Sequence, residues 1–334
     1  MGNAFRRAAG VILHPSSLIL CAALAISAAQ AQQPAWPARV VRIIATSPPG
    51  GSIDFLARTL ADDFGRTFGQ PFIVENRPGA NGNIGVDLVV KAPPDGHMLF
   101  VTAPGPLSIN ASLYDSMPFN PATDVAPIAL LAVAPLVLVV HPSVPARNVK
   151  ELVAFMRAQR GAVNYASQAV GSTGHLAMEL FKSAAKVEAT HVPYRGSAAQ
   201  ATLDLITGRV ATGFVNTSTT LSQIRGGRLR AIAVAEKQRI ASAPDLPTIA
   251  ESGYPGFEAT PWLGLGTRAG TPREITGRLN EAATRALARP EVVERMDKIG
   301  IEPRPMSVEQ FTAFVRAETT RWGDIIRRSG AKAE

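Results

Sequence analysis

The stretch that decides the fold is Val40-Val41-Arg42-Ile43-Ile44, followed closely by Pro48-Pro49-Gly50-Gly51-Ser52. The first segment is a short apolar run rich in β-branched residues, which predicts a buried strand. The second has the proline and glycine residues of a tight turn. Beyond the turn, large apolar residues recur four apart, as on the buried side of a helix. These residues are Leu56, Leu60, Phe64 and Phe68. A strand, a turn and a helix in this order predict the first half of a βαβ unit.

The strand–helix alternation continues along the chain and then starts a second time. Further strands are expected at 72–75, 98–102, 135–140, 164–166, 189–192, 211–214 and 229–234. Helices are expected at 174–185, 197–207 and 217–224, and the last part of the chain is helical. Capping residues predict helix starts at Asn148, Thr271 and Ser307. Two α/β sets with little linker between them predict two lobes, each with a mostly parallel sheet, that face a shared cleft.

The N-terminus, residues 1–31, has the pattern of a secretory signal peptide. Arg6 and Arg7 precede an apolar run at 11–29, and Ala29-Gln30-Ala31 is a small-x-small cleavage site. A membrane anchor is disfavoured, because the apolar run beyond Pro15 is shorter than the roughly 20 residues of a spanning helix. Twin-arginine export and lipidation of Cys21 are weaker alternatives, since two arginines alone prove little and Leu20 is bulky for a lipoprotein site. The expected location is the periplasm.

Composition excludes several classes of protein. The 334-residue precursor has a single cysteine, inside the leader, so the mature chain has no thiol. Cysteine catalysis, zinc–thiolate sites and iron–sulfur clusters are therefore excluded. The net charge of +8 is scattered and has no run typical of nucleic-acid binding. The histidines lack metal-ligand spacing, so neither a metal nor a cofactor is expected.

Two turns are candidates for binding an anion. The Pro48–Ser52 turn lies between a strand and a helix, at the edge of a parallel sheet where ligands bind. Its glycines allow close approach, and the free N–H groups of the helix start favour negative charge. Gly171-Ser172-Thr173-Gly174-His175 occupies the same kind of place in the second set. The pair predicts an anion clamp, although each turn taken alone also fits an ordinary helix start. For Asp54, in the first turn of its helix, a structural role is favoured over a ligand contact.

The sequence has no catalytic constellation. A serine hydrolase would need a Gly-x-Ser-x-Gly elbow, which the segment around Ser172 lacks. Ser172 and His175 lie on the same helix start, and no third group is placed to orient a base. A hydrolase is therefore the weakest of the functional classes, and no catalytic residue is expected.

The chain also resembles the receptor proteins of tripartite tricarboxylate transporters, the Bug family of periplasmic binding proteins, from about Trp36 to the C-terminus. The matching segments include Pro48-Pro49-Gly50-Gly51, Val74-Glu75-Asn76-Arg77-Pro78-Gly79-Ala80, Asn83-Ile84-Gly85, Lys91-Ala92-Pro93-Pro94-Asp95-Gly96, Val139-Val140-His141-Pro142-Ser143, Asn164-Tyr165-Ala166-Ser167, His175-Leu176-Ala177, His191-Val192-Pro193-Tyr194, Leu246-Pro247-Thr248, Gly264-Leu265 and Gly270-Thr271-Pro272.

The resemblance implies a two-lobed α/β periplasmic-binding-protein fold of the Venus-flytrap, type II kind. Lobe one would be 36–138 and 260–334, and lobe two 139–259, with crossover strands at Leu136–Val140 and Trp262–Thr267. A ligand carboxylate would be held by backbone groups and water from both lobes. The residues implied in ligand binding are Gly50, Gly51, Ser52 and Asp54 in lobe one, Ser167, Gly171, Ser172, Thr173 and His175 in lobe two, and Tyr194, Asn216 and Trp262 as cleft walls.

The implied function is a receptor that captures a small carboxylate for the membrane subunits of such a transporter, without catalysis. The alternative is an accessory that presents the ligand to a sensor-kinase ectodomain. A monomer is expected, with no nucleic-acid partner. The family often has Asp where this chain has Val215, before Asn216. Without that partner for an ammonium group, the sequence favours a non-amino carboxylate over an amino acid.

Overall fold

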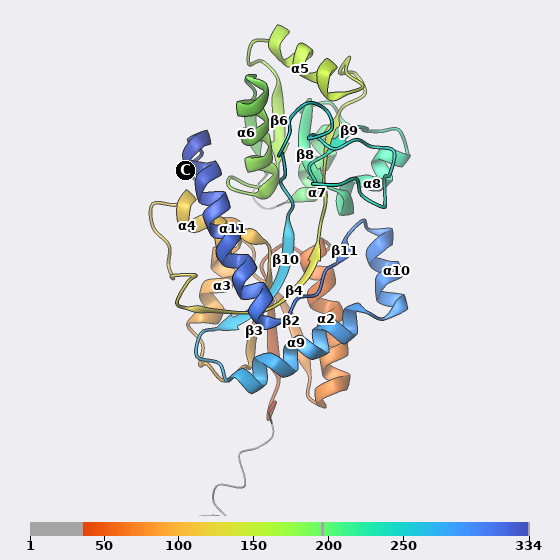
Figure 1. Ribbon diagram of the computed structural model, residues 1–334. Helices are drawn as coiled ribbons and strands as arrows, with labels where there is room; N and C mark the ends of the chain where they lie inside the picture. Colours follow the sequence, from red (N-terminus) through yellow and green to blue (C-terminus); the bar gives the residue numbers. More distant parts are fainter. Residues whose placement is uncertain (1–35, 195–196, 333–334) are drawn as a thin grey trace, which may run out of the picture. The chain divides into compact units, whose positions relative to one another are not determined.

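The computed structural model describes residues 36–194 and 197–332, which form two β-sheets with helices packed on them (Figure 1). In the described part, the larger sheet has six strands in the order β11-β4-β10-β3-β1-β2 and the smaller has five in the order β7-β6-β8-β5-β9. The larger sheet consists of β1 (Val41–Ala45), β2 (Phe72–Asn76), β3 (Met98–Thr102), β4 (Val125–Val133), β10 (Trp262–Arg268) and β11 (Glu302–Pro303). The smaller consists of β5 (Leu136–Val140), β6 (Asn164–Ser167), β7 (Thr190–Pro193), β8 (Thr212–Asn216) and β9 (Arg230–Val234).

The helices follow the strands as a doubly wound α/β pattern requires. Those associated with the larger sheet are α2 (Ser52–Phe68), α3 (Asn83–Val90), α9 (Arg273–Leu287), α10 (Pro290–Lys298) and α11 (Val308–Ser329). The four-residue α4 (Asn110–Leu113) packs on α11 and contributes Leu113 to the core of the smaller sheet. Those associated with the smaller sheet are α5 (Val149–Ala158), α6 (Thr173–Ala185), α7 (Ala198–Ile206) and α8 (Thr217–Arg225). Two short turns of helix, η1 (Ala80–Gly82) and η2 (Gly105–Ile109), complete the described elements.

The chain passes between the sheets twice. Only Ala134 and Pro135 separate β4 from β5, and the return runs through residues 235–261. The two passages are joined by backbone hydrogen bonds, from Ala134 to the Pro261 carbonyl at 2.9 Å and from Ala235 to the Leu136 carbonyl at 2.9 Å. The expectation of mostly parallel sheets is wrong, because both sheets are mixed. In the larger sheet β1 pairs parallel with β2 and β3, whereas β10 pairs antiparallel with β3 and β4, and β11 antiparallel with β4. In the smaller sheet β6 pairs parallel with β7 and β8, and β5, which follows the first passage, runs antiparallel to β8 and β9. The two-lobed α/β fold is thus confirmed.

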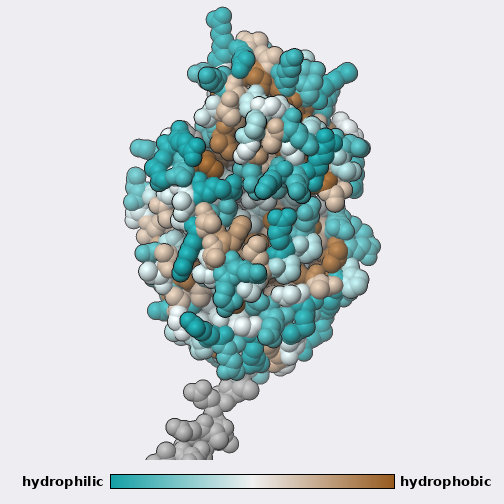
Figure 2. Space-filling view, in the orientation of Figure 1, coloured by the Kyte–Doolittle hydropathy of each residue, from teal (hydrophilic) through white to brown (hydrophobic). Residues whose placement is uncertain are grey.

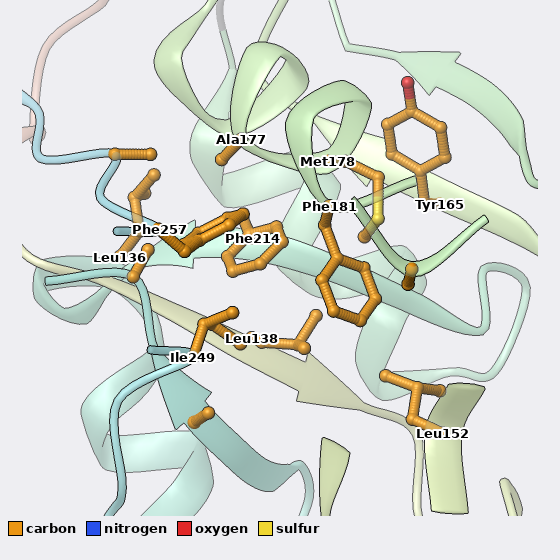
Figure 3. Packing of buried hydrophobic residues seen from close by; sticks show 14 of the residues in the cluster. Leu136, Leu138, Leu152, Tyr165, Ala177, Met178, Phe181, Phe214, Ile249 and Phe257 are labelled. Atoms are coloured by element: carbon orange, nitrogen blue, oxygen red, sulfur yellow. The ribbon is translucent and has the colours of Figure 1, made fainter. Parts of the chain in front are cut away.

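The hydrophobic cores lie under the two sheets. In the larger sheet, Ile44, Phe100 and Leu130 pack against the helices α3 and α11. In the smaller sheet, Figure 3 shows Phe181, Phe214 and Phe257 packed together beside β5. Burying a large apolar side chain contributes about 1.5–3 kcal/mol, so both clusters stabilise the lobes to which they belong.

Helix α11 packs against both cores. Phe311 and Val315, near its start, belong to the cluster of the larger sheet, whereas Trp322 and Ile326 belong to that of the smaller sheet. Figure 1 shows the helix running from the larger sheet to α6. Between the two groups lies the buried Glu318. The two cores are therefore connected by one continuous helix as well as by the two chain passages.

Helix caps at Asn148 and Ser307 are confirmed, but the expected cap at Thr271 is wrong. The Asn148 side chain accepts a bond from the Glu151 N–H at 2.9 Å, and Ser307 forms a reciprocal capping box with Gln310. Helix α9 instead has Pro272 as its cap residue, with no side-chain cap bond. The Thr271 hydroxyl donates back to the Arg268 carbonyl at 2.9 Å, so it does not accept from the helix start.

Polar and apolar side chains are interspersed on the face shown in Figure 2, which is mostly hydrophilic. None of the helices in the described ranges combines the length and the apolar composition that a membrane-spanning segment requires. The predicted signal peptide, residues 1–31, lies outside the described residues.

Candidate functional site

A cavity of about 260 Å³ lies where loops from the two sheets face each other. Its wall is made of the turn after β1, the starts of α2, η2, α6, α7 and α8, and the second chain passage. The lining residues are Ser47, Pro48, Pro49, Gly50, Gly51, Ser52, Ile53, Asn81, Ala103, Pro104, Gly105, Gln168, Gly171, Ser172, Thr173, Gly174, Ser197, Ala198, Ala199, Asn216, Ser218, Thr219, Pro261 and Leu263. No ionisable side chain is among them.

The first turn presents backbone N–H groups to the cavity. Gly50 has φ +88°, a conformation that glycine adopts without strain. Gly51 is the cap residue of α2 and has no side chain to bond the helix start. In the described part of the chain, the N–H groups of Ser52 and Ile53 donate to no other residue. Both residues line the cavity, so their donors are available to a ligand.

Asp54 shapes this turn from behind and does not line the cavity. Its carboxylate accepts bonds from the Gly50 N–H at 3.0 Å, from Arg58 Nε at 3.1 Å and from Asn76 Nδ2 at 2.9 Å. Burial alone would raise the pKa of Asp54, but the bonds from Arg58, Gly50 and Asn76 together lower it. The ionised carboxylate thus holds the Gly50 N–H and fixes the turn.

The second turn is built in the same way and touches the first lobe. Gly171 has φ +73°, and its N–H donates to His175 Nδ1 at 3.0 Å. Ser172 caps α6 by accepting from the His175 N–H at 3.3 Å. The carbonyl of Gly171 accepts a bond from Asn81 Nδ2 at 3.0 Å, which joins the loops of the two lobes across the cavity. Among the described residues, the N–H groups of Thr173 and Gly174 have no acceptor.

Two more helices begin at the cavity, α7 at Ser197–Ala199 and α8 at Asn216–Thr219. A helix N-terminus has a partial positive charge of about half an elementary charge. Four of them reach one cavity, and no carboxylate or cation of the described residues lines it. In addition, the buried Ser218 Oγ has no hydrogen-bond partner among the described residues, as expected of a group that bonds a ligand or water. The arrangement suits an anion held by neutral donors.

A buried pair of histidines supports the second turn. The rings of His175 and His191 stack with their centroids 4.0 Å apart, and Tyr165 stacks on His191 at 4.9 Å. Ser167 Oγ lies 2.6 Å from His191 Nε2. Burial lowers the pKa of His175 to about 4, with Glu179 raising it and Lys182 lowering it by less. Burial and the neighbouring His175 lower the pKa of His191 to about 3. Both rings are neutral near pH 7, so His175 Nδ1 can accept from Gly171.

This pair makes the stability of the fold depend on pH. The pKa of His175 lies below the ordinary 6.5, so the unfolded chain binds more protons between pH 6.5 and 4. The stabilisation is complete above pH 6.5 and is lost as the pH falls towards 4. In His175→Gln, which can still offer an oxygen to Gly171 but does not titrate, we expect a smaller drop in melting temperature over this range. Equal drops in variant and wild type would contradict the assignment.

The structure brings together most, but not all, of the predicted ligand-binding residues. Those that line the cavity are Gly50, Gly51, Ser52, Gly171, Ser172, Thr173 and Asn216. Asp54, Ser167 and His175 lie behind the turns and act on them. Tyr194 and Trp262, expected as cleft walls, do not line this cavity. The Tyr194 hydroxyl donates to Asp204 at 2.8 Å, and Trp262 is buried in the core with its Nε1 donating to Glu318 at 3.1 Å.

Several lining residues were not predicted from the sequence. They are Ser47, Asn81, Gly105, Gln168, Ser197, Ser218 and Thr219. Asn81 belongs to the Gly/Asn-rich loop after β2, and its φ of +49° is of the kind that asparagine tolerates better than most residues. A cluster of glycine and asparagine residues is a sequence sign of backbone with positive φ, and it is the one local sign that could have pointed to Asn81. Gly105 lies in a π-helical turn, for which the sequence has no comparable signal.

A family model described as "Tripartite tricarboxylate transporter family receptor" matches residues 56–331. The protein BugT of Bordetella pertussis is 37% identical over 298 residues, which cover 89% of this chain and 91% of BugT. Among solved structures, "R. palustris Rpa4515 with adipate" is 36% identical with a TM-score of 0.84, covering 89% of this chain and 99% of that one.

A second solved structure, "MatC (Rpa3494) from Rhodopseudomonas palustris with bound malate", is 31% identical with a TM-score of 0.80. The matched region covers 87% of this chain and 100% of the MatC chain. The family model and these relatives each extend over most of the described lobes. The chain therefore belongs to the tripartite tricarboxylate transporter receptor family, whose members are periplasmic solute-binding receptors and not enzymes.

Proposed function

We propose that this protein is a periplasmic receptor that captures a small organic acid and delivers it to the membrane subunits of a tripartite tricarboxylate-type transporter. The observation that carries the proposal is the cavity on which four helix N-termini converge, with no charged side chain among the described residues of its wall. A carboxylate there would gain charge-assisted hydrogen bonds from N–H groups that have no other acceptor in the described chain. Two relatives whose structures hold adipate and malate support the same ligand class.

The proposed ligand contacts come from both lobes. The N–H groups of Ser52 and Ile53 serve the first lobe, and those of Thr173 and Gly174 the second. Because a ligand must accept from N–H groups of both lobes at once, its binding favours the closed arrangement, in which the loops of the two lobes are in contact. The Asn81–Gly171 hydrogen bond belongs to that arrangement.

The ligand is proposed to be a carboxylate without an amino group. No Asp or Glu of residues 36–194 and 197–332 lines the cavity, so an ammonium group would find no countercharge in that wall. Val215, next to the lining residue Asn216, is buried in an apolar cluster of the smaller sheet and offers no charge. An amino acid that binds much more tightly than its deaminated analogue would contradict this part of the proposal.

Export and lobe boundaries are part of the same proposal. A signal peptide at 1–31 would carry the chain to the periplasm. We propose lobe one as 36–134 with 261–334, and lobe two as 135–260. These limits lie a few residues from those expected from the sequence, since residues 136–138 pair with β8 and β9 in the smaller sheet.

A thermal-shift screen of residues 32–334, refolded once to remove bound ligand, tests the proposal. The panel holds mono-, di- and tricarboxylates, aromatic acids, amino acids, sugars and the neutral diamide adipamide. A ligand at about 100 times its Kd stabilises the native state by about 2.7 kcal/mol, which raises the melting temperature by several degrees. We expect carboxylates to do this and adipamide not to. Stabilisation by sugars or cations alone would contradict the proposal.

A further inference from the structure

A further cavity, of about 270 Å³, adjoins the ligand cavity and differs from it in charge. The two share Gly50, Gly51, Ser52, Ser218 and Thr219, so they are neighbouring compartments of one cleft. The remaining lining residues of the second compartment are Asp54, Phe55, Arg58, Arg295 and Ile299. It thus contains ionisable side chains, whereas the described residues that line the first compartment include none.

Arg58 and Asp54 cancel each other's charge. Arg58 Nε lies 3.1 Å from each carboxylate oxygen of Asp54, and Arg58 Nη2 lies 3.0 Å from Oδ1. The same guanidinium also donates to Asn76 Oδ1 at 3.2 Å. This pair already has its function in fixing the first turn, so it leaves no net charge for a ligand.

Arg295 is the cation of this compartment that has no carboxylate partner in the described chain. Its guanidinium lies over the ring of Phe55, 5.0 Å from the centroid. The acids beside it on α10 bond elsewhere, Glu294 to Lys298 at 2.7 Å and Glu291 to Arg289 at 3.5 Å. A guanidinium stacked on an aromatic ring is held flat and keeps its N–H edge free for a carboxylate.

Helix α10 is fixed at this side of the cleft. Arg289, just before it, pairs with Asp63 on α2 at 3.0 Å. Just after it, the carbonyl of Gly300 accepts a hydrogen bond from the Thr217 hydroxyl, at the start of α8. Arg295 and Ile299 are four residues apart and therefore lie on one side of the chain, both lining the compartment. The position of Arg295 relative to the ligand cavity is thus determined from both ends of α10.

We propose that Arg295 binds the distal carboxylate of a linear dicarboxylate whose other carboxylate lies among the helix N-termini of the first compartment. The inference rests on the proposed function and adds a ligand class and a specificity residue to it. The two ends are recognised differently, one by neutral N–H donors and the other by a guanidinium. Ser218 and Thr219, in the shared wall, lie between the two subsites.

The test compares matched ligands in wild type and variants by isothermal titration calorimetry. The ligands are the dicarboxylates from succinate to suberate and the monocarboxylates of the same lengths. We expect wild type to prefer a dicarboxylate over its matched monocarboxylate. Arg295→Gln should weaken the dicarboxylate about three- to tenfold, the range for a partly exposed charge pair, and leave the monocarboxylate unchanged. Arg295→Lys keeps the charge but not the planar guanidinium, so its affinity for the dicarboxylate should lie between those of wild type and Arg295→Gln.

Arg278→Gln is the matched control. Arg278 also stacks on a phenylalanine of α2, with its guanidinium 5.3 Å from the Phe68 ring, but it lines none of these cavities. We expect it to bind both ligand classes as wild type does. If Arg295→Gln weakens both classes equally, or neither, the assignment of Arg295 is overturned while the receptor function stands. If wild type binds neither series but another acid of the thermal-shift panel stabilises it, the dicarboxylate inference alone is overturned. If no acid of that panel binds either, the proposed function is overturned with it.

Discussion

Replacing Glu318 with alanine is expected to lower the free energy of unfolding by about 3–5 kcal/mol, the cost of removing one partner from a buried charge network. The Glu318 carboxylate accepts bonds from Trp262 Nε1 at 3.1 Å and from Trp322 Nε1 at 2.9 Å. It also pairs with Arg321 Nε at 2.8 Å. Alanine would leave two indole N–H groups buried without an acceptor. Since Trp262 and Trp322 belong to the two different cores, the loss would also weaken the connection between the lobes.

Thermal melts monitored by circular dichroism measure this effect. A loss of this size should lower the melting temperature by about 6–15 °C for a protein of this length. The control is Asp324→Ala on the same helix, which removes an exposed pair with Arg327 and should cost no more than about 1 kcal/mol. Glu318→Gln keeps an acceptor oxygen, so its melting temperature should lie between those of Glu318→Ala and Asp324→Ala. A Glu318→Ala variant that melts like Asp324→Ala would refute the role given to this carboxylate.

The second large effect is expected at the cavity wall, from Gly105→Ala. A Cβ at residue 105 would lie 2.5 Å from the backbone oxygen of Asn81 and 2.8 Å from its Nδ2. The loop would have to move, and with it the Asn81 hydrogen bonds to Gly171 at 3.0 Å and to Asn110 at 2.9 Å. We expect a loss of about 1–3 kcal/mol of stability, typical of overpacking, together with at least a tenfold weaker affinity for the ligand.

Affinity measured well below the melting temperature separates the two effects. Gly277→Ala is the control, because nothing lies within 4 Å of a Cβ placed at this position in α9. Because helices favour alanine over glycine, Gly277→Ala should raise the free energy of unfolding by about 0.5–1 kcal/mol and leave the ligand affinity unchanged. Wild-type affinity in Gly105→Ala would mean that the Asn81 loop does not shape the site.

Local patterns were sufficient to predict much of the fold. The strand Met98–Thr102 is found at the expected residues, and the helix striped by Leu56, Leu60 and Phe64 is α2. Strand β4 was missed because its sequence, VAPIALLAV, contains a proline and three alanines, which are poor strand formers. Its place is set by pairing with β10 over the length of both strands, a contact between residues far apart in sequence. Helix α10 was expected only as part of the helical end of the chain, and its separate start at Pro290 was not predicted.

For the site, sequence could predict the two turns but not what surrounds them. Each turn is a local motif, so Gly51, Ser52 and Ser172 could be named in advance. Trp262 was expected in the cleft, and its actual partner Glu318 is 56 residues away, with no local sign of the bond. Arg295 likewise lines the cleft only because the chain just after α10, at Gly300, is hydrogen-bonded to Thr217 at the start of α8. The positions of Trp262 and Arg295 depend on packing between residues far apart in sequence, which a periodic pattern cannot predict.

The most direct test of the central claim is an amide NMR titration of the ¹⁵N-labelled mature protein with adipate and, separately, with neutral adipamide. We expect adipate to shift the N–H resonances of Ser52, Ile53, Thr173 and Gly174 more than any others, since these groups would donate to a carboxylate in the cavity. Adipamide should leave them nearly unchanged. Largest shifts outside the two turns, or equal shifts with both compounds, would contradict a carboxylate held by the helix N-termini of the two lobes.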